Sequence, residues 1–306
     1  MAMFRRLDPL ANANAYQRLT KSPVKSFTIT EPQYDRLQEK RPQLIAREGE
    51  YAVVAVPYCD YLEVHYAFPD VATFRERFND LFNGATGASS KAEAARGLVI
   101  PFRDRPNRAL AQQLFWNLAL DEGMEWVEMN HVAVPEQPEP GNSLESGFMV
   151  REATPADAGA IADIEAEASG QPRLSDGGVQ SIYDHARWLR IVVDSSGAPV
   201  GFIAAHSEPG GWAVIDLLAL RDGVREQLRE PVTRWAMAFL RNNGGRRVRR
   251  RLFMDRTADL ALLRNLGFTP GETGIDYTRA VDPEEVRSKI EERQGHGTLI
   301  KFGDWR

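Results

Sequence analysis

A buried strand that runs directly into a helix is the part of this sequence with the clearest potential for chemistry. The strand is Trp212–Leu220, and a charged segment, Arg221–Glu230, leads from it to a helical pattern at Pro231–Arg241. Such junctions in α/β proteins often bind anionic ligands, because the first N–H groups of a helix have no partner inside the helix. The junction holds one glycine, Gly223, and three acidic residues, so its composition opposes a phosphate loop.

A dense basic run lies further along the chain. An acidic substrate, a cofactor phosphate or RNA could bind there, but no aromatic residue is interleaved with the arginines and no known nucleic-acid motif is present. We therefore expect an exposed strand edge whose arginines pair with acidic residues. The run consists of Arg246, Arg247, Arg249, Arg250 and Arg251.

Several other kinds of site are disfavoured by the sequence. The five histidines and the single cysteine, Cys59, show no metal-ligand spacing, so no metal site is predicted. Motifs of the G-x-S-x-G, P-loop and G-x-G-x-x-G types are absent. One cysteine excludes an intrachain disulfide framework and fits a reducing, cytoplasmic compartment.

Composition also bears on partners and location. The net charge of −5 disfavours general affinity for nucleic acids. No apolar run reaches the roughly 18 residues of a transmembrane helix, and the N-terminus lacks the apolar core of a signal peptide. We expect a cytoplasmic protein with neither membrane nor nucleic-acid partners.

The length of 306 residues favours two domains. Val134–Gly147 contains three prolines, two glycines and no aromatic residue, a composition typical of an interdomain linker. We therefore predict an α/β domain at 1–134, a Pro-rich linker at 135–147, a second domain at 148–281 and a tail at 282–306.

Hydrophobic periodicity predicts alternating strands and helices in both domains. In the first domain we expect strands at 51–56, 61–68, 98–102 and 126–134, helices at 31–40, 69–82 and 106–120, and a loop at 84–95. In the second we expect strands at 148–151, 190–194, 199–206, 212–220, 248–254 and 275–280, and helices starting at Thr154 and covering 182–189, 231–241 and 257–266. This order predicts an α/β fold with a mixed central sheet and flanking helices.

The order of elements in the second domain resembles the fold of the GNAT acyltransferase family. Three short segments resemble it in the correct order. IVVDSSGAPVGFIAAH is similar to the family's hairpin, VIDLLAL to its fourth strand, and LALLRNLGFTPGE to its helix ending in L-G-F. The resemblance covers roughly 149–281 and implies a GNAT-like C-terminal domain beside a smaller, related α/β N-terminal domain.

The resemblance also implies a co-substrate. In GNAT proteins the fourth strand splays from the fifth, and the pantetheine of an acyl-CoA lies in the gap. Acetyl-CoA or another acyl-CoA would then lie along Leu218, Ala219 and Leu220. Arg225 matches the first residue of the family's phosphate pattern, Q/R-x-x-G-x-G/A.

Three positions depart from the family pattern. The two glycines of the phosphate pattern fall on Leu228, which crowds the loop, and Glu230, whose carboxylate repels phosphate. The tyrosine with which many members protonate the leaving thiolate is Leu263 here, and the frequent upstream asparagine falls near Arg256.

Asp216 lies where relatives often have a glutamate that acts as general base for the amine. An attacking amine must lose a proton, and partial burial raises the pKa of a carboxylate toward neutrality. His206, at the end of the hairpin, is the other candidate base. The structural alternatives are that Asp216 is a sheet-edge or helix-capping partner and that His206 is a solvated loop residue.

The first domain repeats part of the second. Val99–Met129 and Leu217–Met254 each contain an apolar strand running into Arg-Asp, a helix with a tryptophan, and a Gly turn before a strand that ends in Met. This similarity indicates a tandem duplication, as in two-domain GNAT proteins. The loop at 103–108 carries three arginines at a helix start and is a second candidate anion site.

Two hypotheses of function follow. The first is an acyl-CoA-dependent N-acyltransferase, with acetyl as the favoured acyl group, acting on a small-molecule or protein amine, with Asp216 or His206 as base. The second is a GNAT-derived scaffold without catalysis that binds a small ligand or a protein. The tail leaves two alternatives open, a strand added to a partner subunit in a homodimer and a loosely docked terminus.

Overall fold

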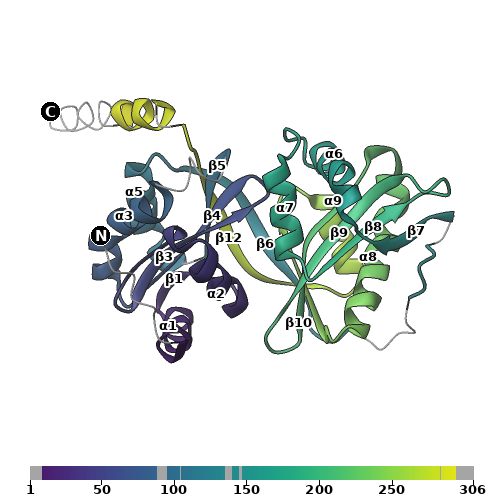
Figure 1. Cartoon of the computed structure of the whole chain (residues 1–306), viewed down its shortest axis with the longest axis horizontal. Coiled ribbons are helices and arrows are strands. Elements are labelled where there is room, and N and C mark those ends of the chain that lie inside the picture. The colour runs from purple at the N-terminus through teal and green to yellow at the C-terminus, as the bar shows by residue number, and fades with distance from the viewer. Residues whose placement is uncertain are drawn as a thin grey trace. The chain divides into compact units, whose positions relative to one another are not determined.

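The computed structural model describes residues 9–87, 95–103, 105–134, 140–144, 147–282 and 284–293. The chain divides into two compact units (Figure 1). The first comprises Met1–Pro57, Tyr61–Met124 and Gly274–Arg306, and the second Tyr58–Asp60 and Glu125–Thr273. The described chain has strands flanked by helices in both units, which confirms the predicted mixed α/β class.

The first unit is a mixed sheet with helices. Its elements are α1 (Pro9–Lys21), β1 (Val24–Ser26), α2 (Glu31–Lys40), β2 (Ile45–Glu48), β3 (Tyr51–Tyr58), β4 (Tyr61–Phe68), α3 (Val71–Gly87), β5 (Gly97–Phe102), α5 (Arg108–Asn117) and the end of β12 (Thr269–Ala280). β4 pairs in parallel with β5, while β2 with β3, β1 with β4, and β5 with β12 are antiparallel.

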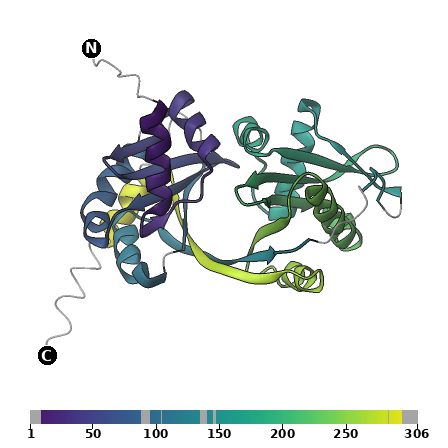
Figure 2. The same ribbon diagram turned by 90° about the horizontal axis from the view of Figure 1, so that it is seen from below.

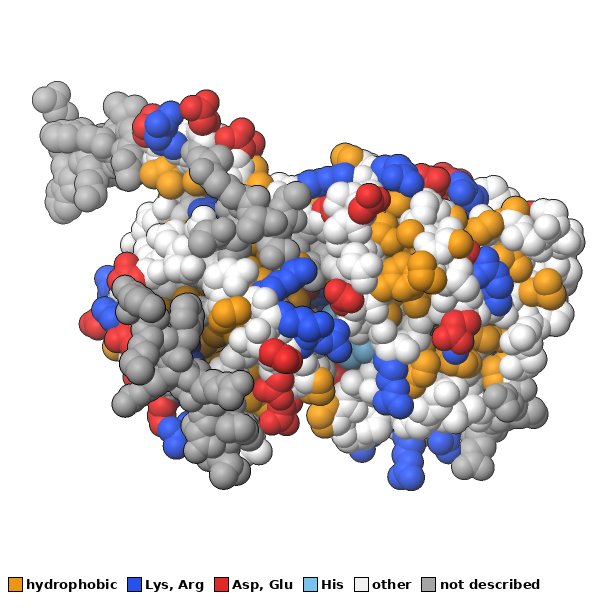
Figure 3. All heavy atoms as spheres, viewed as in Figure 1, with side chains coloured by type: hydrophobic (Ala, Val, Ile, Leu, Met, Phe, Trp, Pro, Cys, Tyr) orange, Lys and Arg blue, Asp and Glu red, His pale blue; other side chains and the backbone are white. Residues whose placement is uncertain are grey.

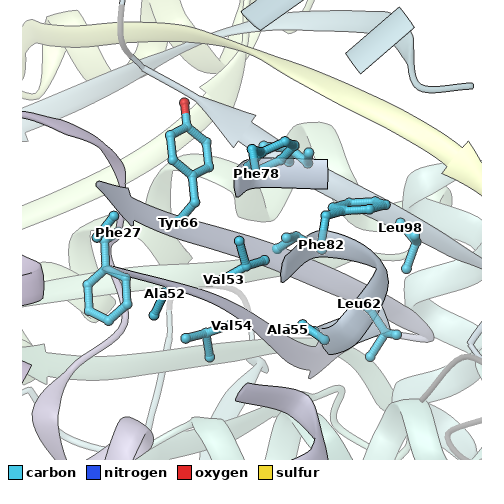
Figure 4. Packing of buried hydrophobic residues seen from close by; sticks show 14 of the residues in the cluster. Phe27, Ala52, Val53, Val54, Ala55, Leu62, Tyr66, Phe78, Phe82 and Leu98 are labelled. Carbon is cyan, nitrogen blue, oxygen red and sulfur yellow. The ribbon is translucent and has the colours of Figure 1, made fainter. Parts of the chain in front are cut away.

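Aromatic side chains form the centre of this unit's core. Phe74, Phe78 and Phe82 recur at helical spacing along α3 and are fully buried. Figure 4 shows Phe78 and Phe82 together with Tyr66 of β4. The rings of Tyr66 and Phe78 meet edge to face with centroids 5.5 Å apart. The periodicity that predicted α3 is therefore the periodicity of its buried face.

The strands of the second unit follow the order β7-β8-β9-β10-β11-β6. β10 and β11 are parallel and the other pairs antiparallel. Its elements are β6 (Asp121–His131), β7 (Met149–Glu152), α6 (Ala158–Ser169), α7 (Asp176–His185), β8 (Trp188–Val193), β9 (Pro199–Glu208), β10 (Trp212–Leu220), α8 (Asp222–Asn242), β11 (Arg247–Phe253) and α9 (Thr257–Asn265).

Helices cover both faces of this sheet. α6 and α7 pack with Phe202, Ala204 and Leu217 on one face. α8 and α9 pack on the other face, against Ala213 and Ile215. In Figure 2 the teal helices of this unit and its green helix α8 lie on opposite sides of the strands. Because successive side chains of a strand point to opposite faces of the sheet, they pack alternately against α6 and α7 on one face and α8 and α9 on the other.

Each compact unit includes segments from both halves of the chain. Residues of β6, before the predicted linker, pair with β11 of the second unit, and the end of β12 pairs with β5 of the first. The described part of the linker packs within the second unit, where Gly141 O accepts a 2.9 Å hydrogen bond from Trp235 Nε1 and Leu144 is buried. A Pro-rich composition indicated extended chain, but composition does not show what that chain packs against.

Most predicted elements are present, with shifts at their ends. α2 and β10 have the predicted bounds. α3 continues to Gly87, so the first part of the loop expected at 84–95 is helical, and 88–94 lie outside the described residues. Residues 284–293 of the tail are helical, and the guanidinium of Arg293 stacks over Trp116 at 3.9 Å. The strand considered for the end of the tail lies outside the described residues.

The internal repeat is offset from the one expected. α3 links the parallel strands β4 and β5, as α8 links the parallel strands β10 and β11. The strand that matches β10 in this arrangement is β4, whereas the repeat expected from the sequence matched β10 with the strand at 98–102. Asp70 precedes α3 and accepts a 2.7 Å hydrogen bond from Thr73 N, so a carboxylate caps that helix.

Membrane insertion finds no support in the helices. Within the described ranges, none is both long and apolar enough to cross a bilayer.

Candidate functional site

β10 and β11 separate part-way along their length. They are paired from Trp212↔Arg247 to Ile215↔Arg250. Beyond that point β10 continues to Leu220 beside β9, and β11 continues to Phe253 beside β6. The strands therefore diverge from Asp216 onward, as the fourth and fifth strands do in the family that the sequence resembles.

Asp216 lies in a β-bulge at the start of this divergence. The pairing of β10 with β9 shifts register between Ile215 and Leu217, which leaves Asp216 as the extra residue. His206 pairs with Val214 on the neighbouring strand, on the face that α6 and α7 cover. The result is a 2.7 Å contact between His206 Nδ1 and Asp216 Oδ2.

A second histidine completes what we call the His–Asp–His cluster, His185, His206 and Asp216. His185 is the last residue of α7, and its Nε2 lies 3.6 Å from Asp216 Oδ1. Its ring meets that of His206 at 4.9 Å and that of Tyr58 at 4.9 Å. The side chains of the three cluster residues are 20%, 12% and 11% exposed, so water reaches them only in part.

His206 and Asp216 form an ion pair at neutral pH. Burial lowers the pKa of His206, but the Asp216 and Glu208 carboxylates outweigh it and raise the pKa to about 10. Burial raises the pKa of Asp216, but the two histidines outweigh it and lower the pKa to about 2. The raised carboxylate pKa that we expected for a general base is therefore not found. A carboxylate paired with an imidazolium accepts protons poorly, whereas the imidazolium is a proton donor.

The structure thus places both predicted catalytic residues together and adds a third. His206 lies in strand β9, so it is not a solvated loop residue. Asp216 contacts two imidazole rings, so its role is not that of a partner for a sheet edge or a cap for a helix. The sequence did not indicate His185, because the three residues come from three elements and follow no short spacing. Two imidazoles and a carboxylate are also a set that could hold a metal ion.

The predicted acyl-CoA residues of β10 lie beyond the divergence. Leu218, Ala219 and Leu220 pair only with β9, at Ile203, Phe202 and Gly201. Ala219 and Leu220 are buried and Leu218 is half-buried. Their backbone therefore has a ladder partner on one side only among the described strands, which is the condition a ligand lying along the strand requires.

The junction after β10 is not a phosphate loop. α8 begins at Asp222, so the segment matched to the phosphate pattern is helical and most of its N–H groups are bonded within the helix. Leu228 is buried against the core. Arg225, the predicted phosphate contact, lies 2.8 Å from Asp222. The helix predicted at Pro231–Arg241 thus extends N-terminally to Asp222, which agrees with a composition that opposed a phosphate loop.

The protein's own carboxylate occupies the start of α8. Glu167, near the end of α6, accepts a 2.7 Å hydrogen bond from Asp222 N and another of 2.7 Å from Arg221 Nη1. Hydrogen bonding to Asp222 N lowers the pKa of Glu167. Glu167 therefore supplies the negative charge that a helix N-terminus attracts, at the place where a ligand phosphate was expected.

The basic run forms β11, which lies between β10 and β6 and is not an edge. Arg249 lies 3.2 Å from Glu208 and stacks over Trp212 at 4.7 Å, so the expected acidic pairing is found there. Charged side chains of both signs are interspersed over the described part of the face in Figure 3.

Arg250 is the exception in this run. Its side chain lies on the face covered by α8 and α9, at the residue where β10 and β11 last pair, and it is 7% exposed. Burial lowers its pKa, and the Asp259 carboxylate opposes that effect. Within the described ranges its guanidinium forms no hydrogen bond or close ion pair. Leu263 is buried in α9, so the family's tyrosine position offers no proton donor.

Comparisons with known proteins agree on the fold. No family model matches the sequence, and no curated protein matches it. Among solved structures, a tandem GNAT protein from the clavulanic acid biosynthesis pathway aligns with a TM-score of 0.59 at 13% identity, covering 90% of this chain and 96% of that one. A Drosophila protein aligns with a TM-score of 0.58 at 12% identity, covering 90% and 98%.

A GCN5-related N-acetyltransferase from Sphaerobacter thermophilus aligns with a TM-score of 0.53 at 19% identity, covering 76% of this chain and 77% of that one. The alignments with the tandem protein span nearly the whole of both chains, which agrees with the repeated parallel strand pairs described above. The chain therefore has the fold of the GNAT acetyltransferases, in a length that matches a tandem GNAT protein.

Proposed function

We propose that the second unit transfers an acyl group from an acyl-CoA, such as acetyl-CoA, to the nitrogen of a small-molecule or protein amine. The observation that carries this proposal is the His206–Asp216 pair at the point where β10 and β11 diverge. Diverging strands offer backbone groups along which a thioester chain can lie, and the pair puts a proton donor beside it. The GNAT fold supports the same activity, but fold alone does not fix the chemistry.

His206 acts as the general acid in this proposal. When the amine nitrogen bonds to the thioester carbon and the C–S bond breaks, the leaving sulfur needs a proton. Asp216 holds Nδ1 of His206, and Nε2, 3.7 Å from the Glu208 carboxylate, is the ring nitrogen that donates its proton to the sulfur. The amine releases its proton to water, from which His206 is reprotonated. Asp216 positions the imidazole and keeps it charged.

The predicted contacts along β10 suit the pantetheine chain of an acyl-CoA but not its pyrophosphate. The pantetheine chain suits the one-sided backbone of Leu218, Ala219 and Leu220. The pyrophosphate does not suit the start of α8, where Glu167 repels it. Arg250, a buried cation at the divergence without a close partner among the described residues, is a further candidate contact for a carbonyl or phosphate oxygen.

The second candidate is a scaffold without catalysis that binds a small ligand or a protein. The Glu167 carboxylate at the start of α8 favours it, because this contact satisfies the helix N-terminus without any ligand. Leu263 in place of a proton donor favours it too.

Calorimetric titration of the full chain with acetyl-CoA and with a long-chain acyl-CoA distinguishes these candidates. We expect binding of at least one of them, and release of free thiol when amines are added. His206→Gln should lower kcat by about 100-fold, the low end for loss of an acid catalyst, with Kd for the acyl-CoA changed little. His131→Gln, outside the cluster, is the matched control.

Failure of both acyl-CoAs to bind wild type and Glu167→Gln would remove the transferase proposal and leave the scaffold. If an acyl-CoA binds but kcat is unchanged in His206→Gln, the transferase proposal stands and His206 is not its general acid. Arg250→Met should weaken acyl-CoA binding without changing the pH profile of kcat.

A further inference from the structure

We propose that the His–Asp–His cluster binds one divalent transition-metal ion, with Zn²⁺ the best match. One donor atom from each of His185, His206 and Asp216 lies within 4.8 Å of the others. The donors come from the end of α7, from β9 and from the bulge in β10, three elements packed in one unit. A site whose ligands come from packed elements keeps its shape better than one built on a loop.

The donor types select the metal. Two imidazole nitrogens and one carboxylate oxygen suit zinc and its neighbours, whereas Mg²⁺ and Ca²⁺ prefer oxygen ligands throughout. With metal–ligand distances of about 2.0–2.1 Å, the ligands of a tetrahedral site lie about 3.3 Å apart. His206 Nδ1 lies 2.7 Å from Asp216 Oδ2, and His185 Nε2 lies 3.6 Å from Asp216 Oδ1, so the two imidazoles approach different oxygens of the carboxylate. With one donor atom taken from each residue, the three donors lie within 4.8 Å of one another, and they must move closer together to hold one ion.

The surroundings support the ligands. Glu208 Oε1 lies 3.7 Å from Nε2 of His206, so a carboxylate faces the ring nitrogen opposite the donor. Such outer carboxylates orient metal-binding imidazoles and increase their basicity. The ring of Tyr58 packs against His185. The Asp216 carboxylate offsets one charge of a divalent ion, while the Glu208 carboxylate also lies 3.2 Å from Arg249. Three protein ligands leave a fourth position for water.

The alternative is a hydrogen-bonded cluster that binds protons only. In that case a proton links His206 and Asp216, and added metal does not bind to the cluster. The two alternatives make opposite predictions for a titration with the metal alone. A bound ion would replace the proton that His206 and Asp216 share, so the metal-bound form and the proton-donating form of the cluster are alternative states. The titration contains no acyl-CoA and therefore tests the metal site separately from the proposed acyl transfer.

The test uses the full chain, freed of metal with a chelator. Calorimetry with Zn²⁺ should give one ion per chain, and Co²⁺ should give the visible absorption of a tetrahedral site with nitrogen and oxygen ligands. His185→Asn and Asp216→Asn should each weaken Zn²⁺ binding by at least about 100-fold, whereas Glu208→Gln should weaken it by about 10-fold. His131→Gln removes a histidine outside the cluster and should leave binding unchanged.

A shift in thermal unfolding with Zn²⁺ serves as a second measurement, because an ion that binds only the folded chain raises its stability. Absence of binding to the wild type, or equal binding in His185→Asn and the wild type, overturns the proposal. Asp216→Asn tests the carboxylate separately, so a folding defect in one variant does not decide the outcome.

Discussion

At the scale of single residues, the bulge at Asp216 is the most informative feature. It brings one carboxylate against two imidazoles that are remote in sequence, and the resulting charges hold each other in place. Burial alone would neutralise each group, and only the mutual attraction keeps both ionised. The His206–Asp216 pair can therefore donate a proton or bind a metal ion, but it is a poor general base.

The same pair makes stability depend on pH. The pKa of His206 is raised to about 10, so its contribution is complete below the ordinary value of 6.5 and is lost as the pH rises from 6.5 to 10. The pKa of Asp216 is lowered to about 2, so its contribution is lost as the pH falls from 3.8 to 2. Urea unfolding at pH 6, 8 and 10 should show falling stability, on the order of a few kcal/mol in all.

In His206→Gln this decline should be much smaller, and in His131→Gln it should match the wild type. Burial lowers the pKa of His131, so its contribution changes below pH 6.5 and not above. An equal decline in all three proteins would show that the His206–Asp216 pair does not control stability in alkali.

At the scale of elements, the continuous helix α8 decides what the β10 junction can bind. In a glycine-rich loop the backbone N–H groups point toward a ligand, whereas in α8 they point along the helix to its own carbonyls. The remaining free end is satisfied by Glu167. The charged residues that disfavour a phosphate loop at this junction stabilise the first turns of α8. Asp222 lies at the helix start, where a negative charge is favourable. Asp222 pairs with Arg225 and Glu226 pairs with Arg229, each at spacing i,i+3.

Glu167→Ala should therefore destabilise the second unit by about 1 kcal/mol, the usual effect of losing a helix cap. Glu167→Gln keeps an acceptor oxygen for Asp222 N and should lose about half as much. Urea unfolding followed by tryptophan fluorescence measures both. Asp163→Ala, on the same helix and paired only at the surface with Arg173, should have little effect. Equal stability of Glu167→Ala and the wild type would mean that the contact at α8 contributes nothing.

At the scale of the whole molecule, each unit contains a strand from the other half of the sequence. The second unit includes the part of β6 that precedes the Pro-rich segment, and the first includes the last residues of β12. Without its strand each sheet would expose the hydrogen-bonding edge of β11 or β5.

Fragments 1–134 and 148–281, the domains expected from the sequence, should therefore not fold separately. Each expressed alone should show no cooperative thermal unfolding, and co-expression should restore a soluble complex with cooperative unfolding. The intact chain is the control. Cooperative unfolding of either fragment alone would show that its sheet is stable without the other half's strand.

Local pattern was enough for the elements and for the class of fold. Strand alternation, helical spacing and capping residues are encoded within a few neighbouring residues, so β4, β10, α2 and the aromatic face of α3 follow from the sequence. The order of these elements and three short matches also led to the GNAT fold. Asp216 and His206 were found because the resemblance pointed to the strand and hairpin that carry them.

What the sequence left open depends on which elements meet in space. His185 joins the cluster because α7 ends beside β9 and β10, a juxtaposition that no spacing records. The direction of the pKa shifts, the role of Glu167 and the exchange of strands between the units depend in the same way on partners 10 to well over 100 residues away. Short-range physics thus determined the elements of this protein, and the tertiary structure alone decided their charges, their caps and their partners, because those energies depend on distance in space and not along the chain.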